Sequence, residues 1–159
     1  MPAEQRRLES TLGFELRLHL GDVLGAQGRG AERQTLLDEA LLLLADLPSL
    51  APDRVRNLFA QAGETLLAAH DPVAAAARAE QLASRLPGDG GALYLAAVLL
   101  ARCASVSGID EADAFAERAV ACLRDALANG FRPVGDLHDV SEFAVLEGRA
   151  DFQAALRKR

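Results

Sequence analysis

The chain has little aromatic surface. Among its 159 residues there is no Trp, a single Tyr and six Phe, so aromatic side chains make up only 4% of it. Apolar residues nevertheless make up 50%, and most are Ala and Leu. A β-sandwich would need more Val, Ile, Thr and aromatic residues, whereas Ala and Leu are strong helix formers. The composition therefore favours an all-α fold, and the length suits one domain over residues 1–159.

Cysteine is equally scarce. Cys103 and Cys122 are the only two in the chain, which is too few for a disulfide framework. Both lie in alanine-rich helical segments without a neighbouring His or Lys to activate a thiol. We expect two small core residues in a reducing compartment, with a reactive thiol as the weaker alternative.

No stretch is apolar enough for a membrane span. The most apolar run, residues 40–45, falls far short of the ~20 residues that a spanning helix needs. The opening MPAEQRRLES is charged and precedes no uninterrupted apolar run, unlike a secretory signal. The formal charge of −6 disfavours binding to a phosphate backbone. We therefore expect a cytoplasmic protein without membrane or nucleic-acid partners, unless a longer parent chain is anchored elsewhere.

The usual signatures of chemistry are also missing. His19, His70 and His138 have no i, i+4 spacing and no Cys-x-x-Cys occurs, so the sequence predicts no metal or cofactor site. The glycine-rich segment 25–30 follows a predicted helix and lacks the Lys-Ser or Lys-Thr of a phosphate loop. No Gly-x-Ser-x-Gly elbow and no kinase catalytic motif is present. The sequence therefore predicts a protein that is not an enzyme.

The apolar residues recur at helical spacing throughout, and no segment alternates convincingly like a strand. Asp53, Asp71 and Asp110 are predicted N-caps. Asn129-Gly130 is a predicted helix end, because glycine adopts the left-handed cap conformation at little cost. Helices are predicted over about 4–24, 31–47, 53–69, 72–86, 92–104 and from the Asp110 cap to Asn129.

Two predicted helices carry clear apolar stripes. We expect the apolar side of the first helix to hold Leu8, Leu12, Leu16, Leu20 and Val23. The stripe of the sixth helix comprises Phe115, Ala119, Cys122, Leu123, Ala126 and Leu127. Two short terminal helices, predicted over 141–146 and 150–156, should cover that stripe through Phe143, Leu146, Phe152 and Leu156.

A spaced set of residues then suggests a family. The clearest unit consists of Phe59, Ala62, Gly63, Leu66, Ala75, Ala79, Leu82 and Pro87. It resembles a tetratricopeptide repeat (TPR), in which two antiparallel helices cross at small residues. A second copy comprises Leu20, Gly21, Leu24, Gly28, Leu37 and Ala40, and departs from the pattern at Arg17 and Arg33. A third begins with Leu93, Ala96, Ala97 and Leu100 and then carries an insertion of roughly ten residues relative to the ~34-residue repeat.

The segment from Phe115 to Phe152 adds a finer resemblance. It looks like the closing part of TPR regions attached to some bacterial serine/threonine protein kinases, although Val145 stands where that pattern has proline. The resemblance implies an α-solenoid of about three hairpins, at about 4–47, 53–86 and 92–129, with a cap at about 132–157. Within the second hairpin, Gly63 should face Ala75.

The resemblance also implies a concave groove that binds a protein or peptide. Its expected lining is Glu15, Leu18, Asp22, Asn57, Ala60, Glu64, Leu67, Tyr94, Val98 and Arg102. Carboxylates at 22 and 64 should repel an acidic peptide terminus, so an apolar or basic segment is favoured, with Tyr94 as an anchor. The partner itself is not identified by the sequence.

Three alternatives remain open. Three hairpins curve little, so the expected groove residues could merely coat a filled surface. A small all-helical enzyme or ligand binder would instead show a buried cavity lined by His19, Asp22 or Glu64. The chain could also be a regulatory or assembly segment of a kinase-like protein.

Overall fold

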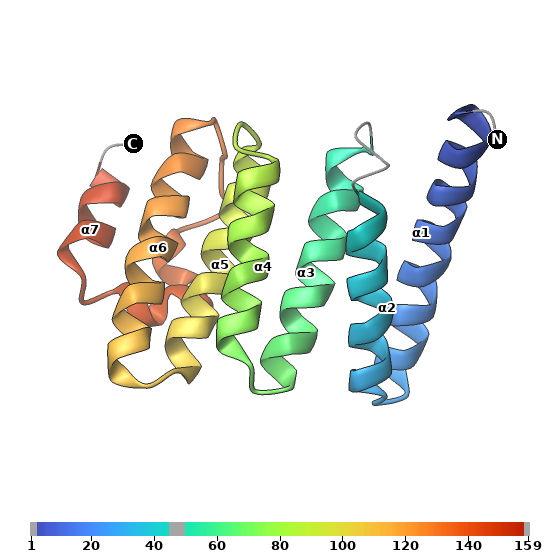
Figure 1. Cartoon of the computed structure of the whole chain (residues 1–159). Coiled ribbons are helices and arrows are strands. Elements are labelled where there is room, and N and C mark those ends of the chain that lie inside the picture. The colour runs from blue at the N-terminus through green and yellow to red at the C-terminus, as the bar shows by residue number, and fades with distance from the viewer. Residues whose placement is uncertain (1–2, 45–49, 158–159) are drawn as a thin grey trace.

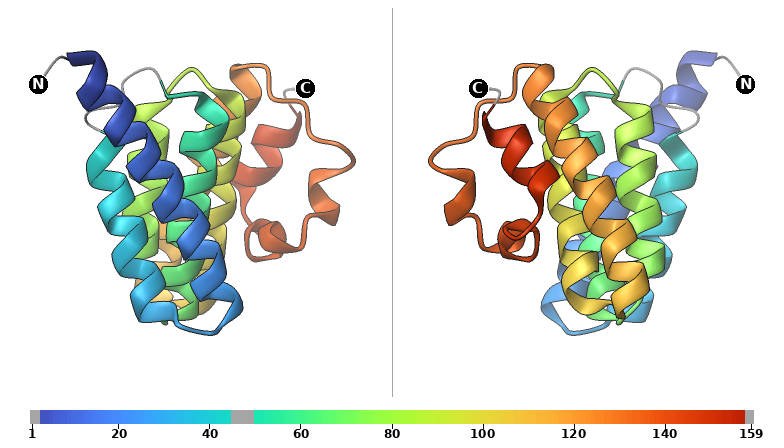
Figure 2. Two further views of the ribbon diagram at one scale, coloured as in Figure 1. Left: turned by 90° about the vertical axis from the view of Figure 1, so that its right-hand side faces the viewer. Right: turned by 90° about the vertical axis from the view of Figure 1, so that its left-hand side faces the viewer.

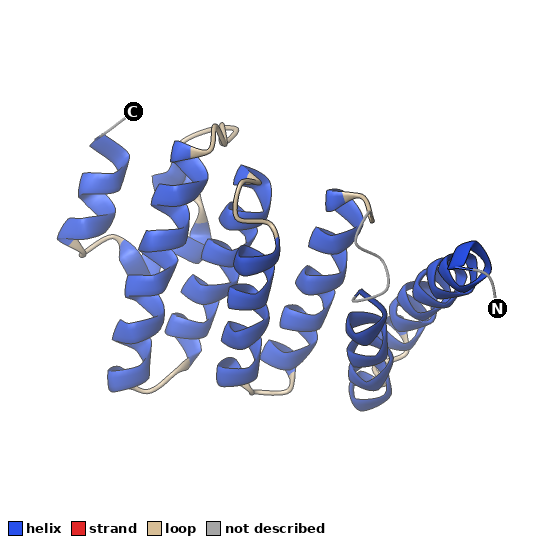
Figure 3. Cartoon of the chain, turned by 45° about the horizontal axis from the view of Figure 1, so that its top comes forward, coloured by secondary structure: helices blue, strands red, loops and turns tan. Residues whose placement is uncertain are grey.

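The computed structural model describes residues 3–44 and 50–157, with side chains from Glu9 onward. Helices and short connections account for these residues and none of them is in a strand, which confirms the all-α prediction (Figure 3). In chain order the elements are α1 (Ala3–Ala26), α2 (Gly30–Leu43), α3 (Pro52–Ala68), α4 (Pro72–Arg85), α5 (Gly90–Val106), α6 (Ile109–Ala128), the 3-10 helices η2 (Leu137–Asp139) and η3 (Ser141–Leu146), and α7 (Ala150–Arg157).

The six long helices stand side by side as antiparallel neighbours, from α1 at one end to α6 and α7 at the other (Figure 1). Viewed along this row, α1, α3 and α5 lie on one side and α2, α4 and α6 on the other (Figure 2). We call these two sides the odd layer and the even layer. Sequential antiparallel pairing of helices agrees with the helical hairpins that the resemblance implied.

Two apolar clusters hold the row together. The first, around Phe14, Leu37 and Leu58, joins α1, α2 and α3. The second, around Leu99 and Leu123, joins α4, α5 and α6 and takes in the tail that follows. Helix pairs of this size cannot bury their apolar faces alone, so stacking of neighbouring pairs supplies the core.

Several helix ends follow directly from local sequence. The Asp71 carboxylate accepts a hydrogen bond from Ala74 N (3.0 Å) and caps α4, whose first residue is Pro72, as predicted. At the end of α6, Gly130 has a φ of +81° and Phe131 N donates to Ala126 O (3.0 Å). This is the glycine-terminated end that the sequence predicted.

Other predicted boundaries were wrong. Asp53 and Asp110 are not N-caps, since α3 begins after Ala51 and α6 after Gly108, without a capping side chain. Both acids lie in the first turn of their helices, where the positive end of the helix dipole stabilises a negative charge. The predicted end of the second helix at residue 47 is not tested, because α2 is described to Leu43, Leu44 keeps helical backbone angles, and residues 45–47 lie outside the described part.

The predicted core face of α1 was also wrong. Leu12, Leu16 and Leu20 of the predicted stripe, together with Val23, are exposed, and Leu8 lies outside the described side chains. The buried face is instead formed by Phe14, Leu18 and Gly21. Leu37 of α2 lies 3.6 Å from where a β-carbon of Gly21 would be, which is an ordinary contact distance, so this position does not require glycine. Phe14 and Leu18 are buried in the apolar cluster that α1 shares with α2 and α3.

The crossing in the second hairpin differs from the prediction as well. Ala75 is buried, but the atoms nearest to a β-carbon built on Gly63 belong to Leu99 of α5. The glycine therefore makes room between α3 and α5, helices of successive pairs, rather than between the two helices of one pair.

The tail after α6 turns back onto the row. Its apolar residues Phe143, Leu146 and Phe152 are buried in the second cluster and Leu156 packs against it, as predicted. Both short helices were expected to cover the apolar stripe of α6, but η3 lies mainly against α5, and α7 is the one that lies against α6. Figure 2 shows this segment standing out on the odd-layer side of the row.

Candidate partner-binding surface

The predicted groove residues all lie on the odd layer. Glu15, Leu18 and Asp22 are on α1, Asn57, Ala60, Glu64 and Leu67 are on α3, and Tyr94, Val98 and Arg102 are on α5. These three helices lie on the same side of the row (Figure 2). Their surroundings differ from one end of that layer to the other.

Three of these residues meet in a hollow between α3 and α5. Glu64, Leu67 and Arg102 line a depression of about 200 Å³, together with Ala68, Ser105 and Val106. Arg102 Nη1 donates a hydrogen bond to Glu64 Oε1, and both side chains remain partly exposed. The two charges neutralise each other, so the hollow presents a closed ion pair beside aliphatic side chains.

The α1 end of the layer has two polar pairs. Glu15 Oε2 accepts from Arg54 Nη1 at 3.0 Å, which links α1 to α3. Asn57 is exposed and its Oδ1 accepts from Gln61 Nε2 at 3.4 Å. Asp22 is exposed, and Ala60 is half-buried. Leu18 lies in the core, so the predicted contact of its side chain with a partner requires α1 to move.

The Tyr94 side chain packs against other aromatic residues of the same chain. Its ring stacks on Phe131, with 4.2 Å between ring centroids and 17° between ring planes. Phe143 meets the same ring edge-on, at 5.9 Å between centroids. Burial raises the pKa of the Tyr94 phenol above its usual value, and the nearby Glu142 carboxylate adds to the effect. The tail thus occupies the surface where the sequence placed an aromatic anchor, while Val98 beside it is half-buried against the core.

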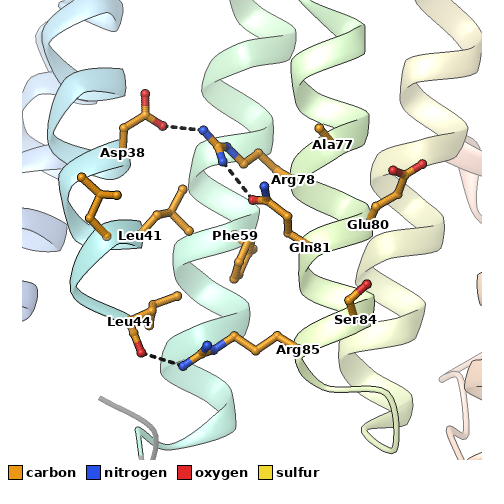
Figure 4. Close-up of a pocket in the computed structure, with 11 residues that line it drawn as sticks. Asp38, Leu41, Leu44, Phe59, Ala77, Arg78, Glu80, Gln81, Ser84 and Arg85 are labelled. Atoms are coloured by element: carbon orange, nitrogen blue, oxygen red, sulfur yellow. Dashed lines mark hydrogen bonds and ion pairs between the residues drawn. The ribbon is translucent and has the colours of Figure 1, made fainter. Parts of the chain in front are cut away.

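A larger groove on the even layer was not predicted from the sequence. It lies between α2 and α4, has a volume of about 1000 Å³, and is floored by Phe59, with Leu41 and Leu44 along one wall (Figure 4). Two arginines of α4 cross it. Arg78 donates to Asp38 Oδ1 (2.9 Å), and Arg85 donates to the backbone oxygen of Leu44 (2.7 Å).

One atom of this groove lacks a partner. Arg78 Nε is buried without a hydrogen bond, although Arg78 Nη1 also donates to Gln81 (2.9 Å). No local signal could have revealed the groove, because Asp38 and Arg78 are 40 positions apart in the chain.

Metal-ligating and nucleophilic groups are dispersed. Within residues 3–44 and 50–157 there is no group of three or more His, Cys, Asp or Glu side chains placed to hold a metal ion. Burial raises the pKa of the Cys103 and Cys122 thiols to about 11. Of the cavity-lining residues in the enzyme alternative, His19 and Asp22 are exposed, and Glu64 is paired with Arg102.

Comparison with known proteins identifies no family for this chain. The chain matches no protein-family model, no curated protein and no solved structure. In the part of the chain that the structure describes, none of the helices combines the length and the apolarity needed to cross a bilayer.

Proposed function

We propose that the chain is a TPR-like module that binds a protein or peptide segment on its odd layer. The observation that supports this most is the hollow between α3 and α5, where Glu64, Leu67 and Arg102 meet. All three were placed in a shared groove on the resemblance alone. Arrays of helix pairs commonly present such a surface, made by the first helix of each pair.

The repeat-like spacing supports the family part of this proposal. Phe59 and Leu93, like Gly63 and Ala97, are 34 positions apart and all four are buried, which matches the repeat length of TPR proteins. The departure at Arg33 has a local compensation. A β-carbon at Gly25 would lie 3.0 Å from Arg33 Nη1, so the missing side chain at 25 accommodates an arginine where the family has alanine.

The hollow favours an apolar partner. Its ion pair leaves Arg102 engaged by Glu64, so little positive charge remains for a peptide carboxylate. Leu67 and the exposed Val106 supply aliphatic contact beside that pair. A basic residue of the partner would find Asp22 exposed on the same layer. Membership in a kinase-like regulatory system is proposed on the sequence resemblance only.

Mapping the binding surface by NMR tests the proposal. A synthetic amphipathic helix of Leu and Lys, titrated into isotope-labelled protein, should shift amide NMR signals on α3 and α5 around the hollow. Leu67→Ser should weaken the binding at least tenfold, whereas Leu42→Ser on the even layer should not. Val106→Ser, at the exposed margin, should weaken binding without affecting the fold.

Two results would overturn this site assignment. One is a map centred on α2 and α4. The other is tight binding of an acidic, carboxylate-terminated peptide that Arg102→Ala abolishes. Absence of binding by the Leu–Lys helix at millimolar concentration would contradict the preference for an apolar, basic segment.

One observation favours a second candidate, a small-ligand site in the even-layer groove. Arg78, whose buried Nε has no hydrogen-bond partner, and the apolar Phe59 both line this groove, so an apolar ligand carrying a hydrogen-bond acceptor would suit its lining. A fragment screen by NMR tests it. Fragments that bind should shift the NMR signals of α2 and α4 and should no longer bind the Arg78→Met variant. Fragments that bind this variant as well as the wild type would exclude the site.

A further inference from the structure

The outer face of α1 carries an aliphatic stripe that no described element covers. Leu12, Leu16, Leu20 and Val23 are 68%, 57%, 40% and 41% exposed. Their spacing places them on one face of the helix. In the left view of Figure 2, α1 lies in front of the row with no other element over it. Contiguous exposed aliphatic side chains of this kind mark interaction surfaces.

We propose that a second copy of this chain covers the stripe, with the two α1 helices packed antiparallel about a twofold axis beside Leu16. A twofold interface requires a patch that is complementary to itself. Leu12 and Leu20 lie four residues on either side of Leu16. An antiparallel pairing therefore places Leu16 against the partner's Leu16, and Leu12 against the partner's Leu20.

The charges flanking the stripe suit a copy of the same surface better than a charged partner. On one flank Glu15 pairs with Arg54 (3.0 Å), and on the other Arg17 Nε donates to Glu39 Oε2 (2.9 Å). In an antiparallel pair each flank meets its own copy, so an ion pair meets an ion pair and both signs are present. A strongly basic or acidic helix would find no net charge there to attract it.

The exposed acids Glu9 and Asp22 lie near the two ends of the stripe, and neither meets its own copy in the pairing. Asp22 is six residues from Leu16 and Glu9 is seven, so in the pair the two copies of Asp22 are about twelve residues apart along the helix axis and the two copies of Glu9 about fourteen. At 1.5 Å per residue even the shorter separation is roughly 18 Å, about twice the screening length at physiological salt. Repulsion between the two copies of either carboxylate is therefore small.

The stripe predicts a weak dimer. Its four exposed fractions together amount to about two fully exposed aliphatic side chains per copy. This is less apolar surface than a standard interface of about 800 Å² per partner buries. We expect a dissociation constant in the range of tens of micromolar, so that the protein is largely monomeric when dilute.

Sedimentation equilibrium from a few micromolar to several hundred micromolar tests the proposal. The wild-type chain should show a concentration-dependent dimer. Leu16→Glu should be monomeric throughout, because two carboxylates would face each other across the axis. The matched control Leu42→Glu changes a leucine of α2 that is 77% exposed and lies off the stripe, and it should dimerise like the wild type. Circular dichroism confirms that each variant is folded.

A charge swap tests the register. Leu16→Glu and Leu16→Lys should each be monomeric, and an equimolar mixture should regain the dimer, because opposite charges then meet at the axis. Leu12→Glu mixed with Leu20→Lys tests the same pairing at a second position. A wild-type chain that stays monomeric at the highest concentration would overturn the proposal and assign the stripe to another partner. So would a dimer that survives Leu16→Glu, or mixtures that stay monomeric.

Discussion

Gly63 of α3 lies directly against the side chain of Leu99 of α5. A β-carbon at position 63 would be 2.9 Å from Leu99 Cδ2, which is closer than real β-carbons approach, and 3.0 Å from Cδ1, which is also unusually tight. Leu99 is fully buried, so its side chain has little space to move. The absence of a side chain at 63 therefore sets how closely the second helix pair stacks on the third.

Gly63→Leu should be among the most destabilising single substitutions. We expect it to lower the free energy of unfolding by about 3 kcal/mol, because a new side chain overpacks the contact with Leu99. Urea denaturation measures the change. Leu99→Ala alone should also destabilise, by roughly 2–5 kcal/mol, through a cavity.

A double variant separates the contact from other effects. In the Leu99→Ala background, Gly63→Ala should be neutral or stabilising, because the clash is gone and alanine favours the helix by up to about 1 kcal/mol over glycine. A Gly63→Leu protein as stable as the wild type would show that α3 and α5 do not meet as described.

Gly90→Ala should destabilise the start of α5. Its β-carbon would lie 3.0 Å from Ala126 O and 3.0 Å from Phe131 N, and backbone atoms do not rotate away as a side chain does. We expect a loss of about 2 kcal/mol in the free energy of unfolding, measured by urea denaturation. Gly88→Ala is the control, since no atom lies within 4 Å of its β-carbon position. Equal effects of the two substitutions would contradict the close approach of α6 to α5.

Phe143→Ala should loosen the tail from α5. The ring is buried against Tyr94 and Phe152, so its removal should cost about 3–5 kcal/mol. Tyr94 is the only Tyr in a chain without Trp, so its fluorescence and its alkaline absorbance report on this place alone. The pKa of the phenol should fall toward its ordinary value as burial is lost. Val145→Ala, on the exposed side of the tail, should change neither signal.

Both thiols should react slowly in the folded protein. Burial raises the pKa of Cys103 and of Cys122 from 9.0 to about 11, so at pH 8 very little thiolate is present. An aromatic disulfide reagent should label them much faster in urea than in buffer. Rapid labelling of the native chain at both positions would contradict the burial of these side chains.

The same shift predicts the direction of a pH effect. Between pH 9 and 11 the folded chain keeps thiol protons that the unfolded chain has released, so stability should fall as pH rises through this window. Well below pH 9 both states are protonated and the two thiols contribute almost no slope. The double variant Cys103→Ala, Cys122→Ala should show a shallower decline in urea denaturation across that range. An unchanged slope would assign the decline to other groups.

Local signals predicted the parts of the fold that depend on few residues. Gly130 ends α6 and Asp71 caps α4, because a left-handed glycine and a capping carboxylate act within one helical turn. The buried tail residues Phe143 and Phe152 were also predicted, since large apolar side chains after a helix stop need a surface to cover.

The orientation of α1 was not predictable in this way. The helix has two apolar faces, and the more regular one, through Leu12, Leu16 and Leu20, is the exposed one. The other face, through Phe14 and Leu18, is the one buried against α2 and α3, and hydrophobic periodicity alone does not distinguish between two apolar faces. The surroundings of Tyr94 were not predictable for a related reason, because the sequence does not show that Phe131 and Phe143 pack against its ring.

Ion pairs between successive helix pairs could not be predicted from the local sequence. Glu64 and Arg102 were each assigned to the groove, but as separate charges, and their hydrogen bond joins residues 38 positions apart. The ion pair changes the expected chemistry of the surface from charged to nearly neutral. The repulsion expected from Glu64 is thereby reduced, and in the binding mode that we propose, aliphatic contact is the main attraction for a partner.

The packing of the tail on α5 and α6 determines at which end of the array further helix pairs could be added. With η3 against α5 and α7 against α6, the place that a fourth helix pair would need is already filled. A hairpin joined behind α7 could stack only after Phe143 and Phe152 had been pulled out of the core. Helices added before α1 could instead pack against the exposed aliphatic stripe of α1. Any lengthening of this array, in a designed protein or in evolution, is therefore easiest at its first helix.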